Sequence, residues 1–184
     1  MSRSRALMFA LALVAITSAL VAADAPKTVS GAGGKLAFKV PDAWTEKQPQ
    51  SAITERELSI PAAGDDKTDG RLTMMSAGGG VEANLERWYG QFTQPDGGNS
   101  RERAKVSKLK VSGCEVHVVD LSGTFRDQRG PVAPAVERPK YRMLAAIVVT
   151  PKAGNYFIKF YGPERTVAEN ERAFMSMIQS LETK

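Results

Sequence analysis

The stretch Met143-Leu-Ala-Ala-Ile-Val-Val149 is apolar at every position. Successive side chains of a β-strand point to opposite faces of its sheet, so a strand with this sequence is buried on both sides. We therefore predict that these residues form a central strand of a sheet whose two faces are both covered. One helix on each face is the simplest cover.

The segments around this strand predict further strands and two amphipathic helices. Apolar residues alternate with polar ones in several short runs, which end at proline- and glycine-containing turns. Helical spacing instead relates Val81, Leu85 and Trp88, and again Phe174, Ile178 and Leu181, after a proline at Pro163. Strands linked mostly by hairpins, with only two long helices, indicate an antiparallel α+β domain. The other predicted strands are 35–40, 53–60, 72–76, 104–111, 114–125 and 156–161, and the central strand extends over 141–150.

The first 23 residues read as a secretory signal peptide. A basic start with Arg3 and Arg5 precedes an apolar run over 6–21, and small residues follow at Ala22 and Ala23. We predict cleavage before Asp24, a secreted or periplasmic product, and no transmembrane segment after signal removal. A retained anchor is the alternative, but the run is short for a membrane-spanning helix.

The remainder has the size of one domain. Of the 184 residues, 161 remain after the predicted cleavage, and their formal net charge falls from +5 to +3 because two arginines are lost. Residues 24–34 are small, polar and glycine-rich, which predicts a flexible leader before a single domain over 35–184. Cys114 is the only cysteine, so the chain forms no internal disulfide, and we expect this side chain to be buried.

Two motifs resemble the PsbP/Mog1-like superfamily. The first is Phe38-Lys-Val-Pro-Asp-Ala-Trp44, and the second is Tyr156-Phe-Ile-Lys-Phe-Tyr-Gly-Pro163 with the apolar helix that follows it. The resemblance implies an antiparallel sheet of about six strands with helices packed on both faces. Within it, the chain is most similar to the uncharacterised, signal-bearing bacterial branch. The known roles in the superfamily are mostly non-enzymatic binding and assembly, and fold analogy alone does not supply a function.

No motif predicts catalysis, a metal or a cofactor. His117 is the only histidine, and in a strand it points to the face opposite Cys114, so the two form no thiolate–imidazole pair. Asp65, Asp66 and Asp69 lack the spacing of a calcium loop, which favours an ordinary turn. The glycine clusters do not match a phosphate-binding loop. We therefore predict no catalytic residue, no metal site and no cofactor.

A basic segment is the candidate interaction surface. Four prolines and glycines between residues 126 and 140 predict a long exposed loop, and such loops often carry function. Its ligand would be an envelope protein or an anionic envelope component, whereas nucleic acid is not expected because the excess charge is small. A variable solvated insertion is the alternative. The candidate residues are Arg126, Arg129, Arg138, Lys140 and Arg142.

The sequence thus predicts an exported, non-catalytic binding or assembly module of the cell envelope with an unknown ligand. The alternative is a secreted or periplasmic hydrolase with an unidentified active site. A cleft with paired carboxylates or perturbed titrating groups would favour the enzyme, and an exposed basic loop on a flat sheet would favour the binding module.

Overall fold

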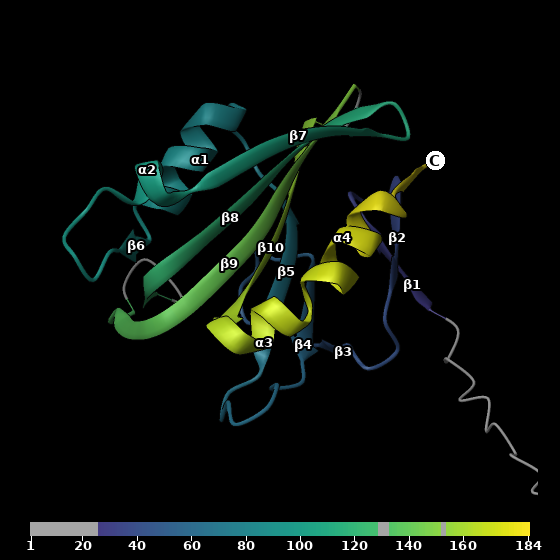
Figure 1. Ribbon diagram of the computed structural model, residues 1–184. Coiled ribbons are helices and arrows are strands. Elements are labelled where there is room, and N and C mark those ends of the chain that lie inside the picture. Colours follow the sequence, from purple (N-terminus) through teal and green to yellow (C-terminus); the bar gives the residue numbers. More distant parts are fainter. Residues whose placement is uncertain (1–25, 129–132, 152–153) are drawn as a thin grey trace, which may run out of the picture.

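The computed structural model describes residues 26–128, 133–151 and 154–184, so the predicted signal peptide lies outside the described residues. A large antiparallel sheet forms the body of the molecule (Figure 1). Its strands follow the order β3-β4-β5-β10-β9-β8-β6, and β7 also pairs with β8. They are β3 (Thr45–Lys47), β4 (Arg56–Ile60), β5 (Gly70–Ser76), β6 (Phe92–Thr93), β7 (Lys105–Val111), β8 (Cys114–Asp127), β9 (Val136–Thr150) and β10 (Gly154–Pro163).

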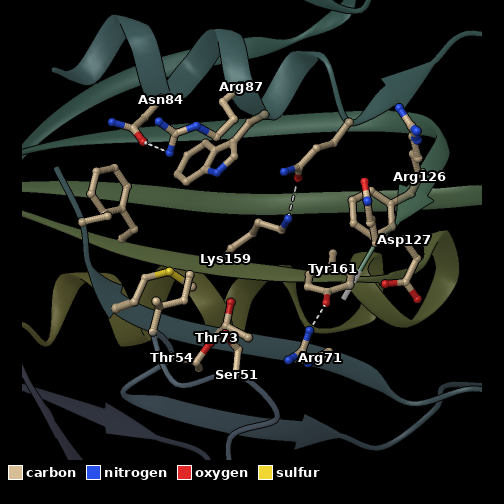
Figure 2. Close-up of a pocket in the computed structure, with 18 of the residues that line it drawn as sticks. Ser51, Thr54, Arg71, Thr73, Asn84, Arg87, Arg126, Asp127, Lys159 and Tyr161 are labelled. Atoms are coloured by element: carbon tan, nitrogen blue, oxygen red, sulfur yellow. Dashed lines mark hydrogen bonds between the residues drawn. The ribbon is translucent and has the colours of Figure 1, made fainter. Parts of the chain in front are cut away.

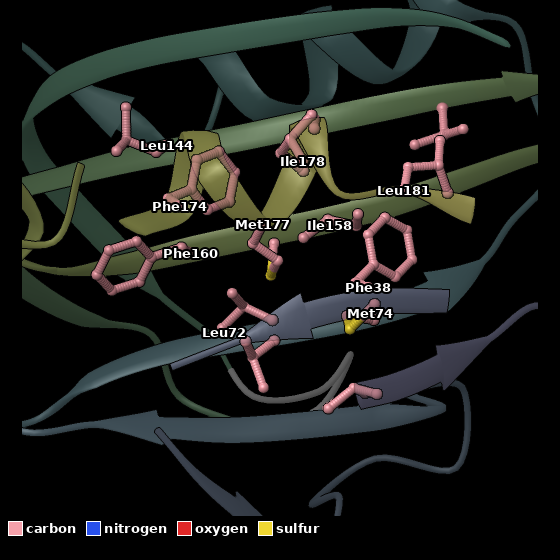
Figure 3. Packing of buried hydrophobic residues seen from close by; sticks show 14 of the residues in the cluster. Phe38, Leu72, Met74, Leu144, Ile158, Phe160, Phe174, Met177, Ile178 and Leu181 are labelled. Carbon is pink, nitrogen blue, oxygen red and sulfur yellow. The ribbon is translucent and has the colours of Figure 1, made fainter. Parts of the chain in front are cut away.

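Strand β9 is central and covered on both faces, as its sequence predicts. Ala145 and Ile147 belong to the apolar cluster beneath α1 (Val81–Tyr89), whereas Leu144 and Ala146 belong to the cluster on the opposite face. That second cluster is closed by α4 (Glu171–Gln179) and by a small sheet, and Figure 3 shows its side chains interleaving. The short helices α2 (Ser100–Arg103) and α3 (Glu164–Glu169) complete the helical elements of the described residues.

The antiparallel α+β class is confirmed, but the number of strands is larger than predicted. The main sheet has eight strands, and a separate three-stranded sheet follows the order β1-β2-β11. Its members are β1 (Lys27–Gly31), β2 (Leu36–Val40) and β11 (Glu182–Thr183). Several of the additional strands span only two or three residues, which is too short for an alternating pattern to be recognised.

The prediction of a flexible leader over residues 24–34 is wrong for β1. Lys27–Gly31 pairs with the whole of β2, and Val29 is only 4% exposed within the apolar cluster. Glu55 accepts hydrogen bonds from the backbone N–H groups of Ala32 and Gly33. The glycine-rich composition gives no sign of this strand. It forms because β2 provides its hydrogen-bonding partner.

Strands β8 and β9 take up both ends of the loop predicted over residues 126–140, since β8 continues to Asp127 and β9 begins at Val136. Phe125 pairs with Arg138, and Gly123 pairs with Tyr141, so β9 carries one extra residue in a bulge. Lys140 lies in this bulge with a φ of 56°, and Pro139 precedes it. The bulge allows the strand to continue past a proline, which cannot donate a ladder hydrogen bond.

The single C-terminal helix that the sequence predicts is divided into α3 and α4. Asn170 separates them, and its side chain donates to the Thr166 carbonyl and accepts from the indole N–H of Trp44 at 3.2 Å. Trp44 is 1% exposed, so the predicted packing of this residue after β2 is confirmed. The break places Phe174, Met177 and Ile178 against the sheet.

Candidate binding cleft

Helix α1 leaves part of its face of the sheet uncovered, and a cleft of about 500 Å³ lies there (Figure 2). The cleft is bounded by α1, by strands β5 and β10, by the end of β8 and by the segment 50–54. Met75, Trp88 and Phe157 contribute apolar surface, and Trp88 meets Phe157 edge to face at 6.1 Å. A volume of this size falls within the range of small-molecule sites.

Lys159 lies on the floor of this cleft, on β10. In the sheet it pairs with Thr73 on one side and with Ala145 on the other, and both neighbours are short. Its Nζ donates to Gln91 Oε1 at 2.6 Å and lies 4.9 Å and 4.7 Å from the ring centroids of Phe125 and Tyr161. Aromatic faces at these distances stabilise a cation.

The surroundings of Lys159 nevertheless favour its neutral form. Burial lowers the pKa of this ammonium group to about 7, the charge of Arg71 acts in the same direction, and Asp127 opposes both. Among the described residues, no carboxylate oxygen lies within 4 Å of Lys159 Nζ. Lys159 is thus a half-buried basic group whose amine is held by an amide and two rings.

Arg71 is fixed beside it by a bidentate ion pair. Its Nε and Nη2 donate to the two carboxylate oxygens of Glu57, each at 2.8 Å, and Nη1 donates to the Tyr161 hydroxyl. Glu57 is only 5% exposed. A planar guanidinium held in this way keeps a fixed orientation at the edge of the cleft.

Two more arginines stand at the rim. Arg87 extends from α1 and donates to Asn84 Oδ1 at 2.9 Å, and Arg126 is exposed near the end of β8. Asp127 is the one carboxylate among the described residues that line the cleft, and it forms an ion pair with Arg138 at 3.5 Å. Arg71 is paired with Glu57, so the excess positive charge at the rim of the cleft comes from Arg87 and Arg126.

The structure separates the five basic residues predicted as an interaction surface. Arg126 lines the cleft, Lys140 is exposed in the bulge of β9, and Arg129 lies outside the described residues. Arg138 pairs with Asp127 near the cleft, but Arg142 lies on the other face of the sheet. The bulge changes the alternation between these two arginines, so spacing along the sequence could not place them.

Arg142 is mostly buried and is bound by two acidic residues. Its Nε and Nη2 donate to the two oxygens of Asp120 at 2.7 Å and 2.9 Å, and Nη2 also donates to Glu171 on α4 at 2.7 Å. Only 13% of its side chain is exposed. These contacts join β8, β9 and α4, so Arg142 is engaged within the fold and is not part of an exposed interaction surface.

Cys114 and His117 lie on opposite faces of β8, as alternation predicts. Cys114 is buried in the cluster under α4, and burial raises the pKa of its thiol. His117 Nε2 lies 2.6 Å from Glu115 Oε1, and neither residue lines the cleft. The arrangement contains no thiolate–imidazole pair.

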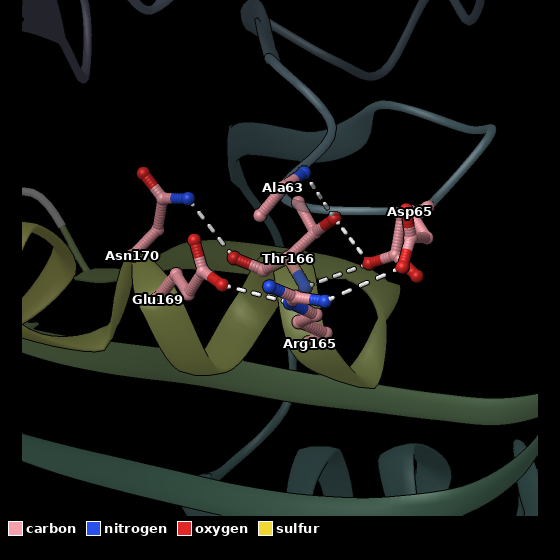
Figure 4. Close-up of polar contacts among 7 residues, drawn as sticks. Ala63, Asp65, Arg165, Thr166, Glu169 and Asn170 are labelled. Atoms are coloured by element: carbon pink, nitrogen blue, oxygen red, sulfur yellow. Dashed lines mark hydrogen bonds and ion pairs between the residues drawn. The ribbon is translucent and has the colours of Figure 1, made fainter.

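The acidic turn between β4 and β5 supports α3 (Figure 4). Asp66 accepts hydrogen bonds from the backbone N–H and the hydroxyl of Thr166, at 2.9 Å and 2.6 Å. Asp69 binds the Ser59 hydroxyl and the backbone N–H of Ala62. Within residues 26–128, 133–151 and 154–184, no group of three or more His, Cys, Asp or Glu residues is arranged to hold a metal ion.

Sequence reasoning missed Lys159, although a signal was present. The segment Tyr156-Phe-Ile-Lys-Phe160 is a strand whose other residues are aromatic or aliphatic, and a lone lysine at such a position is unusual. On the neighbouring strand β5, Arg71 and Thr73 lie on the same face of the sheet as Lys159. Two adjacent strands with polar residues on an otherwise buried face indicate a cleft.

None of the helices in the described ranges has the length and apolar character needed to span a bilayer.

No protein-family model and no curated protein matches the chain. Among solved structures, it is similar to cyanobacterial PsbP (CyanoP) from Synechocystis sp. PCC 6803, with a TM-score of 0.53 and 9% identity, over 91% of this chain and 96% of that one. It is also similar to the Ran-binding protein Mog1p of Saccharomyces cerevisiae, with a TM-score of 0.47 and 11% identity, over 86% and 95% of the two chains. LpqN, involved in cell envelope biogenesis of Mycobacterium tuberculosis, matches with a TM-score of 0.49 and 10% identity, over 81% and 83%. The PsbP/Mog1-like fold predicted from the sequence is confirmed, and at these identities the likeness concerns the fold alone.

Proposed function

Since the chain has the PsbP/Mog1-like fold, we propose that it is an exported, non-catalytic binding module of the cell envelope whose ligand occupies the cleft beside α1. The observation that carries this proposal is the position of Lys159 on the floor of the cleft. A shielded amine without a carboxylate partner is costly for a fold, and the cost is offset when an anionic group binds it. The cationic rim would attract such a ligand.

Export rests on the amino-acid pattern of residues 1–23. A basic start, an apolar run and small residues before Asp24 are the features of a cleavable signal. We expect the protein recovered from the periplasm or the culture medium to begin at Asp24 when its N-terminus is sequenced. An N-terminus at Met1 in a membrane fraction would contradict export by cleavage and support a retained anchor.

The geometry supports binding better than hydrolysis. Perturbation of a titrating group in a cleft is also a feature of enzymes, and Lys159 has it. A hydrolase, however, needs an activated nucleophile, and within the described residues Lys159 hydrogen-bonds to the Gln91 amide and to no hydroxyl. The one carboxylate of the cleft, Asp127, is engaged with Arg138.

Of the predicted basic set, Arg126 is the residue that we retain as part of the binding surface. Its side chain is exposed and lines the cleft, so it is placed to attract an anionic ligand or an acidic envelope partner. Arg138 also lies near the rim, but it is occupied by Asp127. Arg129 stays a prediction because it lies outside the described residues.

A capture experiment tests this function. The mature protein from Asp24 is incubated with small molecules extracted from the native envelope fraction, washed and analysed by mass spectrometry, in parallel with Lys159→Met and with Lys110→Met. Lys110 is exposed on β7 and does not line the cleft, which makes it the matched control. We expect a compound enriched by the wild type and by Lys110→Met but not by Lys159→Met. Equal enrichment by all three proteins, or none by any, would contradict binding in the cleft.

A further inference from the structure

The cleft changes from polar to apolar along the direction of its strands. In the register of β5 and β10, Arg71 stands opposite Tyr161, and Thr73 stands opposite Lys159. The next pair on this face is Met75 opposite Phe157. Successive pairs on one face are about 6.6 Å apart, because a strand rises roughly 3.3 Å per residue. A ligand about 10 Å long would therefore touch both kinds of surface.

The polar end of the cleft presents hydrogen-bond donors from Lys159, Gln91 and Thr73. Lys159 Nζ uses Gln91 Oε1 as an acceptor, which leaves the amide N–H groups of Gln91 for a ligand. Thr73 pairs with Lys159 across the two strands and also lines the cleft, but the Lys159 amine points away from it, toward Gln91 (Figure 2). The Lys159 ammonium and the adjacent Gln91 amide are donors that suit a carboxylate, which accepts with both oxygens.

The apolar end is built from flat or polarisable side chains. Trp88 and Phe157 meet edge to face, and Met75 stands across from Phe157. Ile53, which is 72% exposed, lines the same cleft. Rings and a thioether pack favourably against another ring. An exposed isoleucine at the mouth of a cleft lengthens this apolar surface toward solvent.

We infer that the cleft binds a small acid with a flat apolar body, whose carboxylate contacts Lys159 and Gln91 and whose ring lies against Met75, Trp88 and Phe157. This inference rests on the proposed function and names the class of its ligand. Arg71 is held by Glu57 and so shapes the polar end instead of binding the acid. Arg87 and Arg126 guide the anion toward the opening.

Two probes with the same ring but different charge test whether the cleft prefers an acid. Isothermal titration calorimetry measures the binding of 1-naphthylacetate and of 1-naphthylacetamide to the mature protein at pH 6.5. The two probes share the ring and differ in charge. We expect the acid to bind at least about tenfold more tightly than the amide, which corresponds to about 1.4 kcal/mol. Lys159→Met should remove this preference, and Lys110→Met should keep it.

Lys159→Arg keeps a positive charge at the same position and should therefore retain a preference for the acid. Far-UV circular dichroism and the unfolding temperature show whether each variant is folded, and Met replaces Lys with little change in volume. Equal affinities of the two probes for the wild type would overturn the inference, as would an unchanged preference in folded Lys159→Met. If the envelope capture enriches a compound without an acid group, the binding function stands and the inferred ligand class is wrong.

Discussion

Lys159 links the energetics of the fold to the chemistry of the cleft. Burial and the charge of Arg71 lower its pKa from 10.5 to about 7, although Asp127 acts against them. Arg87 from α1 and Arg126 from β8 add positive charge at the rim of the same cleft. A lysine in this environment destabilises the folded chain when it is charged, so its presence on a central strand points to binding and not to packing.

The pH dependence of stability follows from this shift. Between about pH 7 and 10.5 the unfolded chain holds the Lys159 proton while the folded chain has released it, so the unfolded state binds more protons. The free energy of unfolding of the wild type should therefore rise with pH in this window, relative to Lys159→Met. We expect this difference to change by up to about 1.4 kcal/mol per pH unit, measured by urea denaturation at pH 7, 8 and 9.

The comparison with Lys159→Met cancels the titration of tyrosines, which is common to both proteins. Lys110→Met serves as the control for the loss of a lysine, because Lys110 is exposed on an outer strand and does not line the cleft. Parallel curves for the wild type and Lys159→Met would show that the lysine titrates at its ordinary pKa. The cleft would then be more hydrated than the structure indicates.

At the scale of elements, the hairpin of β8 and β9 shows where sequence reasoning reaches its limit. The apolar run 143–149 was sufficient to predict a central strand, because every position is apolar on both faces. The continuation through Arg138 and Pro139 was not predictable, since a proline and alternating charges are typical of a loop. Only the bulge at Lys140, whose position depends on the partner strand, makes that continuation possible.

The same limit applies to the candidate site. Arg126 was found by its charge, whereas Lys159 was missed because its neighbours in the sequence form a packing motif. Lys159 owes its setting to its neighbours Ala145 and Thr73 on the adjoining strands, and to its place in the cleft beside α1. These are relations between strands distant in sequence, which periodicity along one strand does not encode.

The bulge predicts a stabilising substitution. Lys140 has a φ of 56°, a left-handed conformation that costs a non-glycine residue roughly 1–2 kcal/mol. Lys140→Gly removes this cost. It adds a smaller one, because glycine loses more conformational entropy on folding, so we expect the free energy of unfolding to rise by about 0.5–1 kcal/mol. Lys140→Val should lower it, because β-branched residues tolerate this conformation least. Urea denaturation of the three proteins checks the order, and a glycine variant less stable than the valine variant would contradict it.

For the molecule as a whole, both ends of the described chain are part of one layer. Strand β2 lies between β1 from the N-terminal side and β11 from the C-terminal side, and this small sheet closes the apolar cluster over the main sheet (Figure 1). Lys184 donates its backbone N–H to the Lys35 carbonyl at 2.9 Å, and Arg56 donates to the Ser30 carbonyl at 3.0 Å. The cleavage proposed before Asp24 would leave β1 intact.

Removal of residues 24–34 should therefore destabilise the protein, whereas a flexible leader could be removed without effect. The truncation uncovers Leu36 and Phe38, which are 2% and 0% exposed, and it deletes the buried Val29. It also takes from Glu55 its two backbone donors. Burial of one aliphatic side chain contributes about 1.5–3 kcal/mol, so we expect the free energy of unfolding to fall by at least about 3 kcal/mol. Urea denaturation of proteins that begin at Asp24, Lys27 and Lys35 measures this effect, with the Lys27 protein as the control that keeps β1. Equal stability of all three would mean that β1 contributes nothing to the closure of the core.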